Sequence, residues 1–280
     1  MTLNDKQKQF IEQGYYIEKN CFAISEMTAL FDLFIDLSWS IAKRNNIEIP
    51  RYIPSPSKAV FPDDMKKLDE MMLKILNHDT SLIGELYDTV SYSSTFLRFI
   101  SNQKVETLTK QLLSLDSHIS LYGYTNRIRI DPPNDDRRTY GWHQEVFYTI
   151  PEARYLQTWC PILRNTTIDN GTIEIKPQSH KEGIAKQTWN EVKGRATQII
   201  IDDDILDKYK TIQLEMEVGD LLFFDGRLAH RSGTNSTADE IRFSLVGMWH
   251  DTSHLPFRAP LPNFESRTIT AKEYYKKTKN

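Results

Sequence analysis

Cysteine is scarce in this sequence, which has two cysteines among 280 residues. Cys21 and Cys160 are far apart, and neither belongs to a CxxC motif. The sequence therefore favours neither the disulfide framework of a small secreted protein nor a zinc knuckle. We expect both cysteines to be small, buried hydrophobic residues.

An excess of charge and long apolar runs are also lacking. The net charge is −3, from 35 Lys and Arg against 38 Asp and Glu, so no overall field attracts nucleic acid or acidic membranes. No stretch reaches the ~18 apolar residues that span a bilayer, and residues 1–10 do not resemble a signal peptide. We expect a cytoplasmic protein with a small-molecule substrate, no nucleic-acid partner and no membrane partner.

The first part of the chain, residues 1–117, has the periodicity of helices. Apolar residues recur at helical spacing in residues 28–43 and, after a proline-rich break, again in residues 65–76 and 104–116. The predicted apolar stripes consist of Leu30, Leu33, Phe34, Leu37 and Ile41, then Met65, Leu68, Met71, Met72, Ile75 and Leu76, then Val105, Leu108 and Leu112. We predict a mostly helical part here, which offers a surface for a lid or for a homodimer.

From residue 118 to residue 250 the pattern changes to short segments rich in β-branched and aromatic residues. Gly, Pro, Asn and Asp separate these segments, and most of them have no helix-length pattern between them. This favours an antiparallel sandwich or barrel over a doubly wound parallel sheet. The predicted strands are HISLYGY, NRIRI, GTIEIKP, ATQIII, TIQLEME, DLLFF and IRFSLVGMWH. We expect one domain over residues 1–280, with residues 251–280 as a C-terminal extension.

A histidine followed two residues later by a glutamate occurs twice, at His143 and Glu145 and at His180 and Glu182. The first pair lies among aromatic residues in GWHQEVFY, which fits a strand, so both side chains would point to one face while Gln144 faces away. The second pair lies in KPQSHKEGI between a proline and a glycine, which indicates a loop. We therefore predict metal ligation by the first pair and a structural role for His180.

A third metal ligand is expected at His230, which begins an extended segment after the turn at Asp225 and Gly226. Two histidines and one carboxylate on one face of a metal leave three positions open, an arrangement that suits Fe(II). Twelve residues later, Arg242 alternates with apolar neighbours in a strand, and its guanidinium matches a ligand carboxylate in a bidentate manner. Pairing of a solvent-facing Arg242 with Asp239 or Glu240 fits the sequence equally well.

Several of these segments together resemble the phytanoyl-CoA dioxygenase family of Fe(II)/2-oxoglutarate-dependent oxygenases. The resemblance rests on GWHQE, TWCPI, NGTIEIKPQSH, GDLLFFDGRLAHRSG and IRFSL, and on the entry segment FIEQGYYIEKNCFAISEMTAL. It implies a double-stranded β-helix, or jelly roll, with helices packed outside. It also implies catalysis with iron, 2-oxoglutarate and O2, in which 2-oxoglutarate is decarboxylated to succinate and a C–H bond of the substrate is hydroxylated.

The resemblance also implies roles for particular residues. His143, Glu145 and His230 take the positions of the metal ligands, and Arg242 that of the residue that binds the distal carboxylate of 2-oxoglutarate. Ser232 and Trp159 fall where further co-substrate contacts are common. One departure is Glu145, because the family usually has aspartate there, and the extra methylene raises the alternative of a catalytically retired, binding-only barrel.

Other classes of enzyme also fit the sequence. A zinc hydrolase would use the same ligands without 2-oxoglutarate, and a cupin-type isomerase or sugar-modifying enzyme would not need the arginine. Substrate choice is expected to depend on Arg127 and Arg129, which share one strand face, and on the polar loop 131–141. Inward-pointing arginines would indicate an anionic substrate, but the sequence favours an exposed charged face.

Overall fold

The computed structural model describes residues 4–52, 62–135, 139–149, 153–191, 197–202, 204–255 and 257. The predicted helical part is confirmed in this structure, and the apolar stripe of residues 28–43 lies on the longest helix. The helices are α1 Asp5–Gln13, α2 Ile24–Arg44, α3 Pro62–His78, α4 Ser81–Ser91, α5 Ser94–Ile100, α6 Gln103–Leu112 and the short α7 Ile205–Lys208. The predicted C-terminal extension lies almost entirely outside the described residues.

Antiparallel pairing connects all the strands, as the sequence predicted. A five-stranded sheet has the order β1-β8-β3-β10-β2, and smaller sheets have the orders β7-β4-β9 and β5-β6. The strands are β1 Tyr15–Glu18, β2 Leu121–Asp131, β3 Tyr155–Pro161, β4 Ile173–Ile175, β5 Gln187–Asn190, β6 Gln198–Ile201, β7 Ile212–Gln213, β8 Leu221–Asp225, β9 His230–Ser232 and β10 Arg242–Asp251.

The sheets differ from the sequence analysis in several features, and the strands β3 and β5 were not among those predicted. The strand β1 lies in the part expected to be helical, and it pairs with β8 at one edge of the large sheet. The segment HISLYGY, from Leu121 onward, and the segment NRIRI form one strand, β2. An irregularity in the pairing lies at the point where the sequence predicted a break between them. The register with β10 shifts between Val246 and Met248, and Thr125 has a φ of 53° opposite this shift. Such bulges bend a strand and re-aim its side chains.

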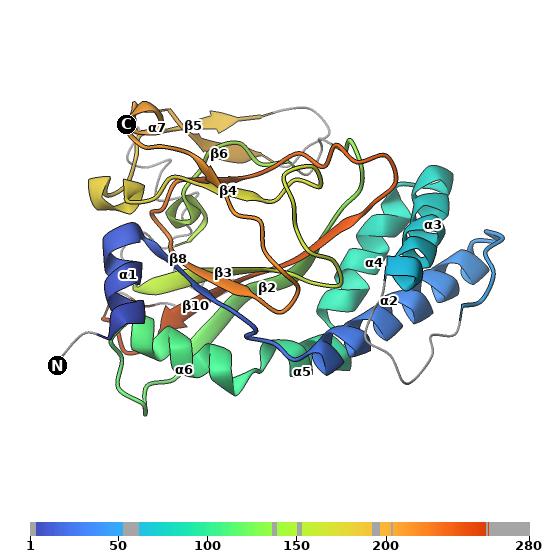
Figure 1. Ribbon diagram of the computed structural model, residues 1–280, viewed down its shortest axis with the longest axis horizontal. Coiled ribbons are helices and arrows are strands. Elements are labelled where there is room, and N and C mark those ends of the chain that lie inside the picture. Colours follow the sequence, from blue (N-terminus) through green and yellow to red (C-terminus); the bar gives the residue numbers. More distant parts are fainter. Residues whose placement is uncertain are drawn as a thin grey trace, which may run out of the picture.

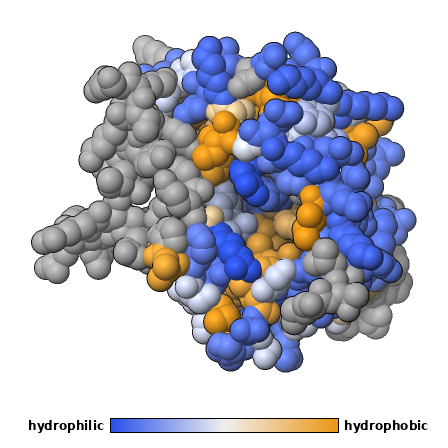
Figure 2. All heavy atoms as spheres, turned by 90° about the vertical axis from the view of Figure 1, so that its left-hand side faces the viewer, coloured by the Kyte–Doolittle hydropathy of each residue, from blue (hydrophilic) through white to orange (hydrophobic). Residues whose placement is uncertain are grey.

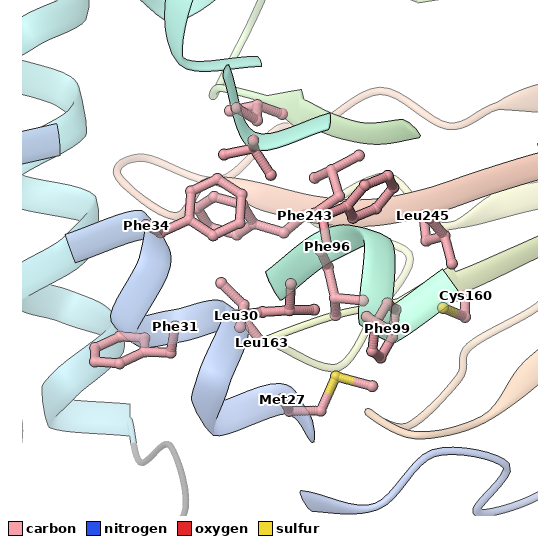
Figure 3. Close-up of a cluster of buried hydrophobic side chains, with 14 of the residues drawn as sticks. Met27, Leu30, Phe31, Phe34, Phe96, Phe99, Cys160, Leu163, Phe243 and Leu245 are labelled. Atoms are coloured by element: carbon pink, nitrogen blue, oxygen red, sulfur yellow. The ribbon is translucent and has the colours of Figure 1, made fainter. Parts of the chain in front are cut away.

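The helices α2 to α6 pack on one face of the five-stranded sheet and share its hydrophobic core, whereas Ile205 of α7 belongs to a separate cluster with β6 (Figure 1). Apolar side chains from α2 and α5 meet Phe243 and Leu245 of β10 and Cys160 of β3 (Figure 3). The rings of Phe34 and Phe243 form an edge contact with 5.0 Å between their centroids. Burial of each such phenylalanine stabilises the fold by about 1.5–3 kcal/mol. Both cysteines are free and buried, as expected.

The opposite face of the large sheet is turned toward the three-stranded sheet. Alternation along β10 places Ile241, Phe243 and Leu245 in the helical core and Arg242 and Val246 on the inner side. A second apolar cluster fills part of the space between the sheets and contains Trp159, Ile173, Ile175, Met216, Leu222, Phe224 and Leu228. The arrangement of two facing antiparallel sheets with helices outside is the one predicted.

The surface is mostly hydrophilic on the side where α1, α7 and the β5-β6 sheet lie. Figure 2 shows this face, on which some hydrophobic residues gather around a hollow near its centre. Among the described residues, no helix combines the length and apolar character needed to cross a membrane.

Candidate active site

The backbones of His143 and His230 are paired directly with each other. Each residue donates its N–H to the other's carbonyl over 3.0 Å, as in one rung of an antiparallel ladder. Paired residues in such a ladder direct their side chains to the same face. The two imidazole rings consequently lie together, with 4.1 Å between their centroids.

Both imidazoles are held with the same nitrogen available for a ligand. Nδ1 of His143 lies 2.8 Å from the carbonyl oxygen of Gly141, and Nδ1 of His230 lies 2.9 Å from that of Leu228. A carbonyl oxygen can only accept, so each Nδ1 carries the proton and each Nε2 keeps a free lone pair. Burial, followed by the nearby His230, lowers the pKa of His143 to about 3. A neutral imidazole is the form that binds a metal.

Glu145 reaches the two imidazoles from a different local structure than expected. It is the first residue of a 3-10 turn, Glu145–Tyr148, and not part of a strand. The intervening Gln144 is extended, with φ −115° and ψ 139°, so residues 143 and 145 still face the same side. Oε2 of Glu145 lies 3.8 Å from Nε2 of His143 and 3.6 Å from Nε2 of His230. The strand prediction was wrong here, but its consequence for the two side chains holds.

The three residues form a group that could hold a metal ion. Their ligand atoms all lie within 4.8 Å of one another. Burial by itself raises the pKa of Glu145, but the nearby His230, His143 and Arg127 outweigh it, so the pKa is lowered. The group therefore offers two neutral nitrogens and one carboxylate oxygen, a donor set suited to a divalent iron with open positions.

Gln144 points away from this group and fixes the segment that carries it. Its side-chain amide donates to the carbonyls of Gly183, over 2.9 Å, and Arg227, over 2.6 Å. Its oxygen accepts from the N–H of Ala185 over 2.8 Å. Because Arg227 directly precedes the segment of Leu228 and His230, Gln144 ties the two ligand-bearing segments together.

A cavity of about 430 Å³ lies against the three candidate ligands. It brings together every residue that the sequence analysis selected: Arg127, Arg129, His143, Glu145, Trp159, His230, Ser232 and Arg242. Both arginines line this cavity, but the expectation of an exposed face holds for Arg127, which is exposed, whereas Arg129 is partly buried. The sequence of β2 alone does not show that this face of the strand lines a cavity.

Arg242 is buried and already has an anionic partner, which is neither Asp239 nor Glu240. Its Nη2 lies 2.9 Å from Oδ2 of Asp131, the residue directly opposite it on β2. Nη1 donates to the carbonyl of Gly233 over 3.1 Å, while Nε has no hydrogen-bond partner among the described residues. The solvent-facing alternative for Arg242 is thus wrong. The second oxygen of Asp131 lies 3.1 Å from Nη2 of Arg129.

Two further residues fix the position of Arg242. At Gly171 the backbone has a φ of 82°, and a Cβ would lie 2.7 Å from Nη1 of Arg242 and 2.6 Å from the carbonyl oxygen of Gly233. Only glycine fits such a position without strain. Asp69 of α3 accepts from the backbone N–H of Ile241 over 3.0 Å and forms an ion pair with Arg164. The start of β10 is therefore anchored to the helical part.

His180 has the structural role predicted for it. It lies in the 3-10 turn η3 Ser179–Glu182, and its Nε2 donates to the carbonyl of Ile11 at the end of α1 over 2.9 Å. Burial lowers its pKa. The imidazole fixes α1 against the small sheet and does not line the cavity.

Sequence reasoning missed Asp131, Gly171 and Gln144 as parts of the site. Asp131 stands in the polar segment DPPNDD, which looks like an exposed loop, and only its register with Arg242 gives it a role. Gly171 had one usable signal, because the pair Asn170-Gly171 is typical of a turn that needs positive φ. Residues 136–138 of the predicted loop lie outside the described residues.

Comparison with known proteins identifies the family and agrees with the fold. The segment 10–244 matches the phytanoyl-CoA dioxygenase (PhyH) family. A curated relative, the dioxygenase FrzG of Cladobotryum sp, is 28% identical over 116 residues, which are 41% of this chain and 34% of the relative. The chain thus matches about a third of the length of such curated relatives.

Two solved structures resemble this one in fold. The epimerase SnoN from nogalamycin biosynthesis, in complex with Fe3+, alpha ketoglutarate and nogalamycin RO, has a TM-score of 0.56 and 15% identity, covering 96% of this chain and 95% of its own. EvdO2 from Micromonospora carbonacea var. aurantiaca, complexed with 2-oxoglutarate, has a TM-score of 0.53 and 16% identity, covering 93% and 96%. These likenesses confirm the predicted jelly-roll fold. With 235 of its residues matched, the chain belongs to the phytanoyl-CoA dioxygenase (PhyH) family.

Proposed function

We propose that this protein is an Fe(II)- and 2-oxoglutarate-dependent oxygenase that hydroxylates a C–H bond of a small molecule. One observation carries the proposal. His143, Glu145 and His230 converge, with both Nε2 atoms free, on the wall of a cavity that also contains Arg242. Family membership supports it, as do the iron and 2-oxoglutarate complexes of proteins with the same fold.

The residues present fit both the metal and the co-substrate. His143, Glu145 and His230 would hold Fe(II) and leave coordination positions for 2-oxoglutarate and O2. Arg242 would bind the distal carboxylate, because its buried Nε–H has no hydrogen-bond partner among the described residues. Ser232 and Trp159 line the same cavity and are proposed as further co-substrate contacts.

The chain itself provides binding, orientation and exclusion of water. When bound, the metal and 2-oxoglutarate would supply the oxidation: 2-oxoglutarate would be converted to succinate and CO2 with one oxygen atom of O2 entering the succinate, and the other oxygen atom would enter the substrate. The two Nδ1–H bonds to backbone carbonyls fix the imidazole planes, and Asp131 fixes the guanidinium of Arg242. Burial of these groups excludes bulk water from the reacting atoms.

The longer side chain of Glu145 is compatible with this role. Its Oε2 reaches within 3.6 and 3.8 Å of the two Nε2 atoms, so one ion between them can contact all three. A binding-only barrel is the alternative that this residue raised, and turnover separates the two. An active enzyme produces succinate from 2-oxoglutarate when O2 is admitted, whereas a binding-only barrel holds iron and 2-oxoglutarate without turnover.

Anaerobic titration of the full chain with Fe(II) and then 2-oxoglutarate tests the proposal. We expect a visible charge-transfer band that saturates with 2-oxoglutarate, followed by succinate formation after O2 is added. His230→Ala should abolish both, while His118→Ala, at an exposed histidine, should change neither. A band of full intensity in His230→Ala would refute the assignment of the metal ligands.

Two further variants separate the roles of the remaining groups. Arg242→Lys keeps the charge opposite Asp131 but loses the bidentate fork, so it should weaken 2-oxoglutarate binding far more than Fe(II) binding. Equal effects on both would contradict its co-substrate role. Glu145→Asp shortens the carboxylate by one methylene, and retained succinate formation would show that the site accepts either acid.

The cellular location, the homodimer and the domain organisation are also proposals. A cytoplasmic location agrees with the two free, buried cysteines, because cytoplasmic proteins rarely depend on disulfides. The homodimer surface on the helical part stays a prediction, and so does the organisation of residues 1–280 as one domain.

A further inference from the structure

The charges that line the cavity do not balance. Among the described residues, the cavity is lined by four arginines and two acids: Arg127, Arg129, Arg231, Arg242, Asp131 and Glu145. Arg231 is neutralised by Glu174, with 2.8 Å between its Nη2 and Oε2 of the acid. Three arginines then face two carboxylates.

Binding of the metal and co-substrate leaves this surplus unchanged. The two positive charges of Fe(II) are cancelled by the two negative charges of 2-oxoglutarate. The surplus of one positive charge therefore persists in the loaded site. This unpaired positive charge at the cavity attracts a substrate that carries a negative charge.

The position of each arginine shows which one is free to meet that substrate. Arg127, Arg129 and Asp131 alternate along one face of β2, opposite Val246, Ser244 and Arg242 of β10. Arg242 and Arg129 are both bound to Asp131, and the guanidinium of Arg129 also lies 5.5 Å from the ring centroid of Tyr140.

Arg127 differs from Arg129 and Arg242 in its partners and in its position. It has no ion-pair or hydrogen-bond partner among the described residues, and it lies at the end of the row furthest from Arg242. Arg127 is exposed to solvent and lines the same cavity as the candidate metal ligand Glu145. The side chains of Tyr124, Tyr148 and Met248 line the same cavity and offer apolar and aromatic surface.

We propose, on the basis of the function proposed above, that the substrate is a small organic anion and that Arg127 binds its anionic group beside the metal. The aromatic residues then contact the organic body of the substrate. A guanidinium binds carboxylate, phosphate and sulfate groups by the same charge-assisted hydrogen bonds, so the shared chemistry is that of an oxyanion. Arg127 is thus a substrate-binding residue distinct from Arg242.

Calorimetric titration of the anaerobic Fe(II) and 2-oxoglutarate complex tests this inference without knowledge of the natural substrate. The probes are benzoate, phenylacetate and octanoate, each compared with its own primary amide, which has nearly the same shape and no charge. In the presence of saturating 2-oxoglutarate, at least one acid should bind roughly tenfold more tightly than its amide, as expected for one charged hydrogen bond. Equal or weaker binding of all three acids would overturn the inference.

Variants at Arg127 assign the effect to this residue. Arg127→Gln should weaken binding of the acid by roughly tenfold to a hundredfold and leave the amide nearly unchanged. Arg127→Lys should lie between it and the wild type, because the charge remains. Arg98→Gln is the matched control, since it removes the same charge from an exposed residue of α5 outside the cavity.

The 2-oxoglutarate band separates failure of this inference from failure of the proposed function. Absence of the band in the wild-type protein would refute the oxygenase proposal itself. A normal band together with no preference for acids would refute only the anionic substrate. If Arg127→Gln weakens 2-oxoglutarate as strongly as the probe acid, Arg127 belongs to the co-substrate site, and the inference is overturned.

Discussion

Replacement of Asp131 by asparagine removes the carboxylate that Arg129 and Arg242 share inside the protein. Burial alone raises the pKa of Asp131, but the two arginines lower it from 3.8 to about 2. A difference of nearly two pKa units corresponds to about 2 kcal/mol of folding free energy. Because the folded pKa is the lower one, this stabilisation is complete above about pH 4 and is lost as the pH falls toward 2.

The variant also leaves buried guanidinium groups without this counter-ion, which adds to the loss. Removal of one partner from a buried ion pair typically costs about 3–5 kcal/mol. We therefore expect Asp131→Asn to lower the free energy of unfolding by about 3 kcal/mol at neutral pH, measured by urea denaturation followed by circular dichroism. The loss relative to the wild type should shrink when both proteins are compared near pH 3.

2-Oxoglutarate should repair part of this defect, because its distal carboxylate can replace the missing one beside Arg242. The rise in melting temperature on adding saturating 2-oxoglutarate to the anaerobic Fe(II) protein should be larger for Asp131→Asn than for the wild type. Asp220→Asn is the matched control, because Asp220 is an equally buried acid paired with Lys19 away from the cavity. Equal rescue of the two variants, or none in Asp131→Asn, would refute the proposed position of the co-substrate.

Three further predictions concern the supports of the site. Gly171→Ala should weaken 2-oxoglutarate binding at least tenfold and leave Fe(II) affinity nearly unchanged in calorimetric titrations, because the new Cβ would lie 2.7 Å from Nη1 of Arg242. In the control Gly84→Ala nothing lies within 4 Å of the new atom, so the binding of 2-oxoglutarate and of Fe(II) should both stay unchanged. Gln144→Ala should reduce the free energy of unfolding by about 2–4 kcal/mol and weaken Fe(II) binding, since it removes three buried hydrogen bonds, and unchanged Fe(II) affinity would contradict its positioning role. Burial lowers the pKa of His250 to about 4, so the imidazole takes up a proton more readily in the unfolded chain. The free energy of unfolding should therefore fall as the pH is lowered from about 6.5 to 4. His250→Phe should flatten this slope in denaturation measured across that range, and an unaltered slope would contradict the role of His250.

Much of the site could be predicted from the sequence because its chemistry depends on residue type and short spacing. The spacing of His143 and Glu145 places both side chains on one face of any extended segment, and this remained true although Glu145 begins a 3-10 turn. The alternation around Arg242 likewise identified the inner face of β10, which the core position of Phe243 confirms. Such local patterns survive small errors in the assignment of secondary structure.

The contacts that sequence reasoning missed all depend on register between distant segments. Asp131 reaches Arg242 because β2 and β10 pair at that residue, across more than a hundred positions of the chain. The face of β2 that carries Arg127 and Arg129 lines the cavity, and no periodicity within NRIRI encodes which face does so. The strand β1 was missed for the same reason, since its four residues become a strand only through pairing with β8.

The two kinds of candidate metal ligand are held in different ways, and this difference explains how the site can accept a glutamate. The histidines are fixed by main-chain bonds, namely their own ladder pair and the carbonyls that receive each Nδ1–H. Glu145 begins a short turn instead, so its carboxylate can approach the imidazoles along a path set by its own side-chain torsions. A change in the length of the acid therefore alters the carboxylate position without displacing either nitrogen, and the site retains its donor set with either residue.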